Sequence, residues 1–282
     1  MNYKLICSDI DGTLLNKERQ LSEKTIRVIK KIKDSIPVVL ISSRMPKAMR
    51  HLQVEMDMQT HPLIAYNGGL VLAYDEGVPK TILSIEIPID LTQLILKFIN
   101  KSTIHLSLYN ADDWFVPEMD YWAKREMNNT KVTPEVANLE TICQQWQSEN
   151  KGPHKIMAMG NEHEIQLLEN FLNMYYAEQL HIYRSKSTYI EIASKEISKL
   201  SALSFLLDKK YDINLLEVVA FGDNYNDMEL LGGVGLGVAV ANAKEEVKAI
   251  ADQITLTNLE DGVAETLLGM KYLPAYVDGN TD

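Results

Sequence analysis

The sequence predicts an α/β fold in which a doubly wound, Rossmann-like parallel sheet forms a core that is interrupted by an inserted α+β domain. Short apolar runs alternate with helical segments near both ends of the 282-residue chain, which is typical of parallel sheets covered by helices. Residues 37–41 (Pro-Val-Val-Leu-Ile) form a continuous apolar run, as expected for a strand buried on both faces. The alternation changes character in the middle of the chain, which indicates the insertion.

The first part of the core, residues 1–81, alternates between predicted strands and helices. Strands are expected over residues 3–8, 37–41 and 63–66. Ser22 is a suitable N-cap for a helix that carries isoleucines at positions 26, 29 and 32 on one side. Pro46 suits the first turn of a second helix.

Residues 82–189 are predicted to form the inserted domain. Two strand-like runs, 70–74 and 81–86, flank an Asp-Glu-Gly-Val-Pro turn, which indicates a hairpin where the insertion begins. The other expected elements are helices over 91–100, 121–127, 139–147 and 162–176, and strands over 105–109, 114–117, 155–159, 181–184 and 188–193.

Residues 190–282 return to the alternating pattern and complete the core. The expected elements are helices over 199–208, 226–231 and 244–251, strands over 218–221 and 235–240, and a closing segment over 261–268. Residues 278–282 are expected to form a frayed tail.

The composition disfavours several classes of function. The net charge of −11 argues against binding to nucleic acid or to an anionic membrane, because both require a basic surface. No run approaches the ~18 apolar residues of a membrane-spanning helix. An acidic protein that binds an anionic substrate must build a local positive site, for which a metal ion, a lysine or a helix N-terminus is suitable.

The two cysteines, Cys7 and Cys143, show no metal-ligand spacing. Two buried free thiols in a reducing compartment are therefore expected. Ser8 and Asp9 interrupt the first apolar run at once, which is unlike a secretion signal. We expect a cytoplasmic protein.

Residues 9–13 (Asp-Ile-Asp-Gly-Thr) follow the first predicted strand. In an open α/β sheet, ligands bind beyond the carboxyl ends of the strands. Because side chains at i and i+2 of an extended chain point the same way, Asp9 and Asp11 should reach one space, where their repulsion favours a bound proton or cation. Gly12 permits a sharp turn and Thr13 offers a hydroxyl. The alternative is an Asp-rich turn that caps a helix.

A second acidic turn, residues 222–227 (Gly-Asp-Asn-Tyr-Asn-Asp), follows the apolar run 218–221. If Asn226 begins a helix, Asp223 lies in the loop before it, and the carboxylates of Asp223 and Asp227 face the same crevice. Hard oxygen ligands of this kind suit Mg²⁺. Taken alone, the turn fits a helix N-cap equally well.

Two further residues are candidates for binding a phosphate group. Ser42 ends the second predicted strand, and its hydroxyl and the following backbone N–H groups could hold a phosphate oxygen. Lys199 begins a helix, where its positive charge opposes the helix dipole. This unfavourable electrostatic energy favours a functional role for the residue. Taken alone, Ser42 is explained better as the ordinary start of a helix, and Lys199 is explained better as a solvated lysine.

Together, these four stretches resemble the motifs of the haloacid dehalogenase superfamily, in particular its Cof-type sugar-phosphatase branch. Residues 9–13 are similar to the first motif, Ser42 to the second, Lys199 to the third and residues 222–227 to the fourth. The resemblance continues through Asn-Gly-Gly at 67–69, Gly-Leu-Gly-Val-Ala at 235–239, Asn-Ala at 242–243 and Glu-Asp-Gly-Val-Ala at 260–264.

The resemblance implies a Mg²⁺-dependent phosphatase with an aspartyl-phosphate intermediate. Asp9 would be the nucleophile, and Asp11 would act first as general acid and then as general base. The metal would be held by Asp9, the backbone carbonyl of Asp11 and Asp223. Asp227 would orient the metal shell, directly or through water.

The resemblance also implies how a substrate is held. Ser42 and Lys199 would stabilise the charge of the transferring phosphoryl group, and the inserted domain would be a large cap that excludes water and selects the leaving group. The family usually has Thr-Gly-Arg where this chain has Ser-Ser-Arg at 42–44, which keeps the hydroxyl. The candidate substrate contacts are Gly12, Thr13, Ser43, Arg44, Asn67, Gly68, Asn226 and, in the cap, Arg184.

The expected partner is a small phosphomonoester, such as a sugar phosphate; nucleoside monophosphates and vitamin-derived phosphates stay open. One alternative is a phosphotransferase or mutase that passes the phosphoryl group to a sugar hydroxyl. Another is a non-hydrolytic module that senses a phosphorylated metabolite. Such a module should have lost Asp11 or Lys199, and both are present, so a phosphatase is the leading hypothesis.

Overall fold

The computed structural model of the protein describes residues 3–270, so the tail predicted at 278–282 lies outside the described residues. The chain divides into two compact units. Among the described residues, the first comprises residues 3–43, 49–82 and 198–270, and the second comprises Arg44–Ala48 and Leu83–Ile197.

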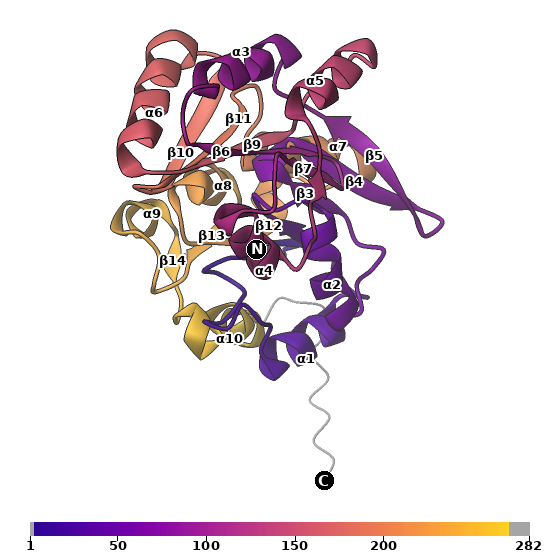
Figure 1. Cartoon of the computed structure of the whole chain (residues 1–282). Coiled ribbons are helices and arrows are strands. Elements are labelled where there is room, and N and C mark those ends of the chain that lie inside the picture. The colour runs from indigo at the N-terminus through magenta and orange to yellow at the C-terminus, as the bar shows by residue number, and fades with distance from the viewer. Residues whose placement is uncertain (1–2, 271–282) are drawn as a thin grey trace. The chain divides into compact units, whose positions relative to one another are not determined.

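The first unit is built on a sheet with the strand order β14-β13-β12-β1-β2-β3-β4-β5 (Figure 1). Its strands are β1 (Leu5–Ser8), β2 (Val38–Ile41), β3 (Leu63–Ala65), β4 (Leu70–Asp75), β5 (Val78–Ser84), β12 (Val218–Gly222), β13 (Leu236–Ala239) and β14 (Gln253–Ile254). The pairs from β14 to β3 are parallel, and β4 pairs antiparallel with β3. Every residue of β1, β2 and β12 is buried, as their continuous apolar sequences predict.

Helices connect these strands. They are α1 (Glu23–Ile32), α2 (Lys47–Glu55), α7 (Lys199–Lys210), α8 (Met228–Gly233), α9 (Glu245–Ile250) and α10 (Gly262–Gly269), with short 3₁₀ turns η1 (Tyr66–Gly68), η2 (Leu215–Glu217), η3 (Tyr225–Asp227) and η4 (Asn258–Glu260). The predicted N-cap of α1 is confirmed, because the side chain of Ser22 accepts a hydrogen bond from the backbone N–H of Thr25.

The order of the strands places a switch in direction beside β1. From β1 the chain proceeds to β2 and β3 on one side, whereas β12, β13 and β14 follow on the other side. In doubly wound sheets, the loops at such a switch diverge and leave a crevice at the carboxyl ends of the strands. The predicted parallel α/β core is confirmed, and its topology marks the ends of β1 and β12 as the place for a site.

The second unit contains a separate sheet with the order β10-β11-β9-β6-β7-β8. Its strands are β6 (His105–Asn110), β7 (Asp113–Val116), β8 (Glu135–Val136), β9 (Lys155–Met159), β10 (Leu180–Lys186) and β11 (Tyr189–Ser194), and its helices are α3 (Ile89–Ile99), α4 (Tyr121–Thr130), α5 (Leu139–Ser148) and α6 (Glu162–Tyr176). Apolar residues of α3, α5 and α6 share one hydrophobic core with Leu106, Leu108 and Ile156 of the sheet. This is the α+β organisation that the sequence predicts.

Two details differ from the expectation. The second part of the core is expected from residue 190 onward, whereas β11 pairs with β9 and β10 and the second unit continues to Ile197. An apolar run in a strand has the same pattern in either sheet, so the sequence does not show which sheet it joins. The short strands β8 and β14 were not predicted, because two residues carry no periodicity.

Candidate active site

The carboxyl ends of neighbouring parallel strands carry the candidate residues. Asp9 follows β1, Ser42 follows β2, and Asp223 follows β12. The backbone N–H of Asp9 donates to the carbonyl of Phe221 at 3.0 Å, so the β1–β12 ladder itself fixes the backbone at Asp9. Asp9 is 5% exposed and Ser42 is 2% exposed, and both therefore lie in the protein interior rather than on a solvated turn.

The Lys199 ammonium group joins the two acidic motifs. Its Nζ donates to Oδ1 of Asp9 at 2.6 Å and to Oδ1 of Asp227 at 2.7 Å, and the residue is 1% exposed. Lys199 is the first residue of α7, whose N-cap Ser198 forms a capping box with Ser201. A buried cation at a helix N-terminus is unfavourable by itself, so the two carboxylates are what stabilise it there.

These contacts decide the charge of Lys199. Burial lowers the pKa of its ammonium group, but the adjacent carboxylates of Asp227 and Asp9 raise that pKa by more, and the net direction is upward. Lys199 is therefore a permanent cation at neutral pH, which suits a group that stabilises a phosphoryl anion and does not suit a proton donor.

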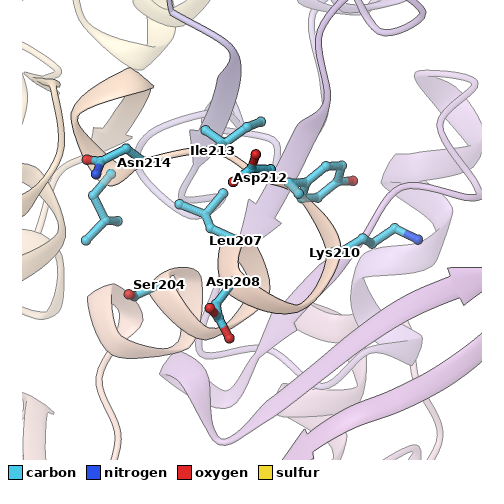
Figure 2. Close-up of a pocket in the computed structure, with 9 residues that line it drawn as sticks. Ser204, Leu207, Asp208, Lys210, Asp212, Ile213 and Asn214 are labelled. Carbon is cyan, nitrogen blue, oxygen red and sulfur yellow. The ribbon is translucent and has the colours of Figure 1, made fainter.

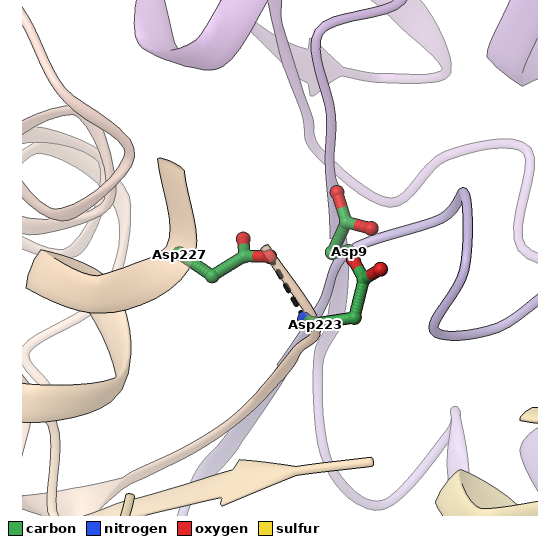
Figure 3. A group of neighbouring side chains, drawn as sticks. All are labelled: Asp9, Asp223 and Asp227. Atoms are coloured by element: carbon green, nitrogen blue, oxygen red, sulfur yellow. Dashed lines mark hydrogen bonds between the residues drawn. The ribbon is translucent and has the colours of Figure 1, made fainter. Parts of the chain in front are cut away.

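Asp227 is fully buried and holds both the lysine and the loop. Its Oδ2 accepts hydrogen bonds from the backbone N–H groups of Asp223 at 3.0 Å and Asn224 at 3.1 Å, while Oδ1 accepts from Lys199. Figure 3 shows its carboxylate pointing toward Asp223 and Asp9. Gly222 is required beside it, since a Cβ there would collide with the Asp227 side chain. With each of its oxygens accepting from the protein, Asp227 is placed to position the site.

The helix at this turn begins later than predicted. The expected start is Asn226, but residues Tyr225–Asp227 form the 3₁₀ turn η3 and α8 begins at Met228. The carboxylates of Asp223 and Asp227 still approach one another, because the Asp227 side chain folds back onto the loop N–H groups rather than pointing along a helix.

Asp223 borders the loop after β1. Oγ1 of Thr13 donates to its Oδ1 at 3.4 Å. Gly12 adopts a φ of +85°, and a Cβ at this position would collide with the Asp223 carboxylate, so the close approach requires glycine. Burial, and next the charge of Asp227, raise the pKa of Asp223 to about 7.

The acidic cluster fits a divalent cation. Asp9, Asp223 and Asp227 each offer an oxygen, and these atoms lie within 4.8 Å of one another. Burial raises the pKa of Asp9 well above its usual range, and Asp227 and Asp223 raise it further against the opposing effect of Lys199. Three carboxylates against one ammonium leave a surplus of buried negative charge, which a cation bound by hard oxygen ligands would neutralise.

Several other predicted residues lie around this cluster. Asp11 is exposed, two residues beyond Asp9. The carbonyl of Ser42 accepts a hydrogen bond from the N–H of Asn67 at 2.9 Å, and Oδ1 of Asn67 accepts from Nδ2 of Asn226 at 2.9 Å. A Cβ at Gly68 would collide with the carbonyl of Ser198, so the Asn-Gly turn packs against the start of α7. The half-buried Ser43 follows Ser42 directly.

The two arginines have partners of their own. Arg184 lies on β10 in the second unit and forms an ion pair with Glu169, and its guanidinium also donates to the carbonyl of Ser187. Arg44 is buried and donates to the carbonyl of Ala48, within the Arg44–Ala48 segment that belongs to the second unit. Their roles as substrate contacts stay predictions.

Two asparagines at the same edge were given no role by sequence reasoning. Nδ2 of Asn242 donates to the carbonyl of Gly12, and Nδ2 of Asn258 donates to the carbonyl of Leu15, both at 2.7 Å. The sequence signal that could have found Asn242 is its position shortly after a core strand.

Cys7 and Cys143 are buried free thiols, as predicted, and burial raises the pKa of each.

A pocket of about 390 Å³ elsewhere in the first unit does not contribute to this site. Figure 2 shows its lining residues, which include Ser204 and Asp208 of α7 and Asn214 in the loop that follows. Lys199 is at the opposite end of α7. The residues that line the pocket come before β12 in the chain, whereas Asp223 comes after it. The pocket therefore lies at the amino ends of the strands, away from the carboxylates of Asp9, Asp223 and Asp227.

Comparison with known proteins identifies the family. The model of a haloacid dehalogenase-like hydrolase family matches residues 6–267. The chain belongs to this family. A Haemophilus influenzae protein described as a candidate phosphatase is 33% identical over 94% of this chain and 97% of its own. The 5-amino-6-(5-phospho-D-ribitylamino)uracil phosphatase YitU of Bacillus subtilis is 30% identical over 93% and 96%.

Solved structures agree with this assignment. A haloacid dehalogenase-like hydrolase from Bacteroides thetaiotaomicron matches with a TM-score of 0.84 and 27% identity, covering 94% of this chain and 98% of its own. A Thermotoga maritima protein matches with a TM-score of 0.84 and 30% identity, covering 95% and 97%. The family and the enzyme class that the sequence predicts, a phosphoric monoester hydrolase, are confirmed.

None of the helices within residues 3–270 is long and apolar enough to cross a membrane.

Proposed function

We propose that this hydrolase is a Mg²⁺-dependent phosphatase of small phosphorylated metabolites that works through an aspartyl-phosphate on Asp9. The observation that carries the proposal is the Lys199 ammonium group between Asp9 and Asp227, at 2.6 and 2.7 Å, in a cluster with surplus negative charge. A cation and a lysine together supply the local positive charge that an acidic protein needs to bind a phosphate group.

The chemistry takes two displacement steps at phosphorus. Lys199 orients the Asp9 carboxylate through Oδ1, and a carboxylate oxygen of Asp9 forms a bond to phosphorus while the ester P–O bond breaks. Asp11 gives its proton to the departing alkoxide. Asp11 then takes a proton from water as the water oxygen attacks phosphorus, and inorganic phosphate leaves with Asp9 regenerated.

The remaining residues bind and orient. Lys199 and Ser42 would stabilise the charge of the transferring group. Asp9, Asp223 and the carbonyl of Asp11 would hold Mg²⁺, which supplies charge neutralisation at the phosphoryl oxygens. Asp227 would keep Lys199 and the Asp223 loop in place through the hydrogen bonds described above.

Sugar phosphates are the proposed substrates. The two relatives from B. subtilis that are named as 5-amino-6-(5-phospho-D-ribitylamino)uracil phosphatases are 30% and 28% identical to this chain. Their named substrate carries its phosphate on a sugar-alcohol chain. Sugar and sugar-alcohol phosphates therefore stand first in the panel to be tried, followed by nucleoside monophosphates and pyridoxal phosphate.

The test is release of phosphate from this panel with Mg²⁺ and with EDTA. The wild type should turn over with Mg²⁺ alone, and Asp9→Asn should be inactive while its circular dichroism spectrum stays that of the wild type. An active Asp9→Asn protein would exclude this mechanism. Product analysis in the presence of a sugar acceptor separates a hydrolase from a phosphotransferase. A folded wild type that binds Mg²⁺ and a phosphorylated metabolite without turnover would instead indicate a sensing module.

A further inference from the structure

The loop that carries Asp11 leaves the sheet immediately after Asp9. The parallel ladder fixes β1 only as far as the N–H of Asp9. Beyond it, the carbonyl of Ile10 accepts from the N–H groups of Leu14 and Leu15, both at 3.0 Å, which shapes the turn. The exposed Asp11 lies inside that turn. The position of Asp11 therefore depends on the hydrogen bonds of this turn and also on the groups that hold the loop from outside.

Two asparagines from other loops hold it. Asn242, in the loop after β13, donates its Nδ2 to the carbonyl of Gly12 at 2.7 Å. Asn258, the first residue of η4, donates its Nδ2 to the carbonyl of Leu15 at 2.7 Å. The two are also joined to each other, because the N–H of Asn258 donates to Oδ1 of Asn242 at 2.9 Å. We name this pair, Asn242 and Asn258, the asparagine clamp.

The clamp is itself fastened to the core. The N–H of Lys244 donates to the carbonyl of Asp223 at 3.0 Å, and the N–H of Ala241 donates to the carbonyl of Leu256 at 3.2 Å. The loops after β12, β13 and β14 thus form one connected edge. Each clamp carboxamide spans from this edge to a backbone carbonyl after Asp11: Asn242 to Gly12, within the turn, and Asn258 to Leu15, at its end.

We propose that Asn242 and Asn258 are positioning residues for Asp11, which they keep at the distance from the leaving group that proton transfer requires. The inference rests on the function proposed above. General acid catalysis depends on a heavy-atom separation near hydrogen-bond length, and a misplacement on the order of 1 Å costs up to about 100-fold in rate. A loop restrained by two carboxamides meets this demand although its acidic side chain is solvated.

The test uses the dependence of the rate on the leaving group. An alkyl phosphate needs the proton of Asp11 when its P–O bond breaks, whereas p-nitrophenolate leaves without one. In Asn242→Ala and Asn258→Ala, kcat/KM for a hexose phosphate should fall roughly 10- to 100-fold, and kcat/KM for p-nitrophenyl phosphate should fall much less. A merely structural effect lowers both values together and leaves their ratio unchanged.

Two more variants isolate the bond to Gly12. Asn242→Asp keeps the acceptor for the N–H of Asn258 but replaces the donor to Gly12 with a carboxylate, so it should change the ratio at least as much as Asn242→Ala. Asn242→Gln keeps the carboxamide and should recover part of the loss. Asn214→Ala is the matched control, because the Asn214 side chain, like that of Asn242, accepts a hydrogen bond from a backbone N–H in the first unit, but it does so away from the Asp11 loop.

Hydrogen exchange provides a readout that does not need turnover. Amides of residues 10–15 should exchange faster in Asn242→Ala and Asn258→Ala than in the wild type or Asn214→Ala. Unchanged exchange, or an unchanged ratio of the two kcat/KM values in an active enzyme, would overturn the clamp. A wild type without Mg²⁺-dependent hydrolysis would instead refute the proposed function, and faster exchange in the clamp variants would still show that the asparagines restrain the loop.

Discussion

The two units bury polar groups in opposite ways. In the first unit, Lys199 faces Asp9 and Asp227 within a cluster that contains a third carboxylate. In the second unit, the buried His105 places Nδ1 at 3.0 Å from Oδ2 of Asp120 and Nε2 at 3.0 Å from Oγ of Ser107. Burial lowers the pKa of His105, although Asp120 opposes this, so the ring is neutral and one hydrogen bond satisfies each nitrogen.

The balance of charge and hydrogen bonds distinguishes a network that stabilises the fold from one that forms a functional site. A network in which a neutral imidazole has a partner for each nitrogen costs little once folded and can specify a unique packing. A buried cluster with surplus charge is destabilising unless another ion completes it. We therefore regard the His105 network as structural and the Lys199 cluster as the site to which the proposed function assigns cation and phosphate binding.

Removing the lysine should have the largest effect. Lys199→Met leaves two buried carboxylates without their counter-charge, so the free energy of unfolding should fall by roughly 3–5 kcal/mol, and kcat should fall by at least ~100-fold. Urea unfolding and phosphate release measure the two effects. Lys209→Met, on the same helix but exposed, is the control. A Lys199→Met protein as stable as the wild type would remove the contrast between the units.

The next largest effect should be on the dependence of stability on pH, and bound metal should remove it. Asp223 has a pKa of about 7 in the folded protein against 3.8 as its ordinary value, and Asp9 shifts in the same direction. In EDTA these two carboxyl groups bind more protons in the folded than in the unfolded state between about pH 4 and 7, so their contribution to the free energy of unfolding should fall as the pH rises through this window. Saturating Mg²⁺, which binds the deprotonated carboxylates, should remove that fall. The buried His105 and His154, whose pKa values burial lowers, contribute in the opposite direction, so the carboxyl contribution is measured as the difference between the wild type and Asp223→Asn.

Unfolding by urea at pH 5 and pH 8 checks this expectation. Asp223→Asn is the matched variant, since it keeps the shape of the side chain and removes its titration. In EDTA, the free energy of unfolding of this variant should fall less with rising pH than that of the wild type. The same change in stability between pH 5 and pH 8 in the metal-free wild type and in Asp223→Asn would show that the cluster is not strained by its charge.

The smallest effect is expected in the second unit. Ser107→Ala removes one hydrogen bond to His105, so the free energy of unfolding should fall by about 1 kcal/mol, with the affinity for Mg²⁺ unchanged. Isothermal titration with Mg²⁺ and urea unfolding measure both. A changed Mg²⁺ affinity in this variant would mean that the two networks are not independent.

Much of this protein could be predicted from local patterns. The apolar runs of β1, β2 and β12 and the N-cap at Ser22 depend on residues close in sequence, and the structure agrees with each. The contact between the backbone N–H of Asp223 and the carboxylate of Asp227 is equally local, since both residues lie in one turn. The late start of α8 could not be predicted, because the Asp227 side chain competes with helix formation by accepting from the loop N–H groups.

The sequence by itself determined the fold class, the family and the acidic motifs, because periodicity and motif spacing are properties of neighbouring residues. Only the tertiary structure decided that Lys199 bonds to Asp9, 190 positions away, and that Asn242 reaches Gly12 across 230 positions. These contacts exist because parallel strands bring their carboxyl ends to one edge. Which side chains meet there depends on strand order and loop packing, which no short stretch of sequence contains.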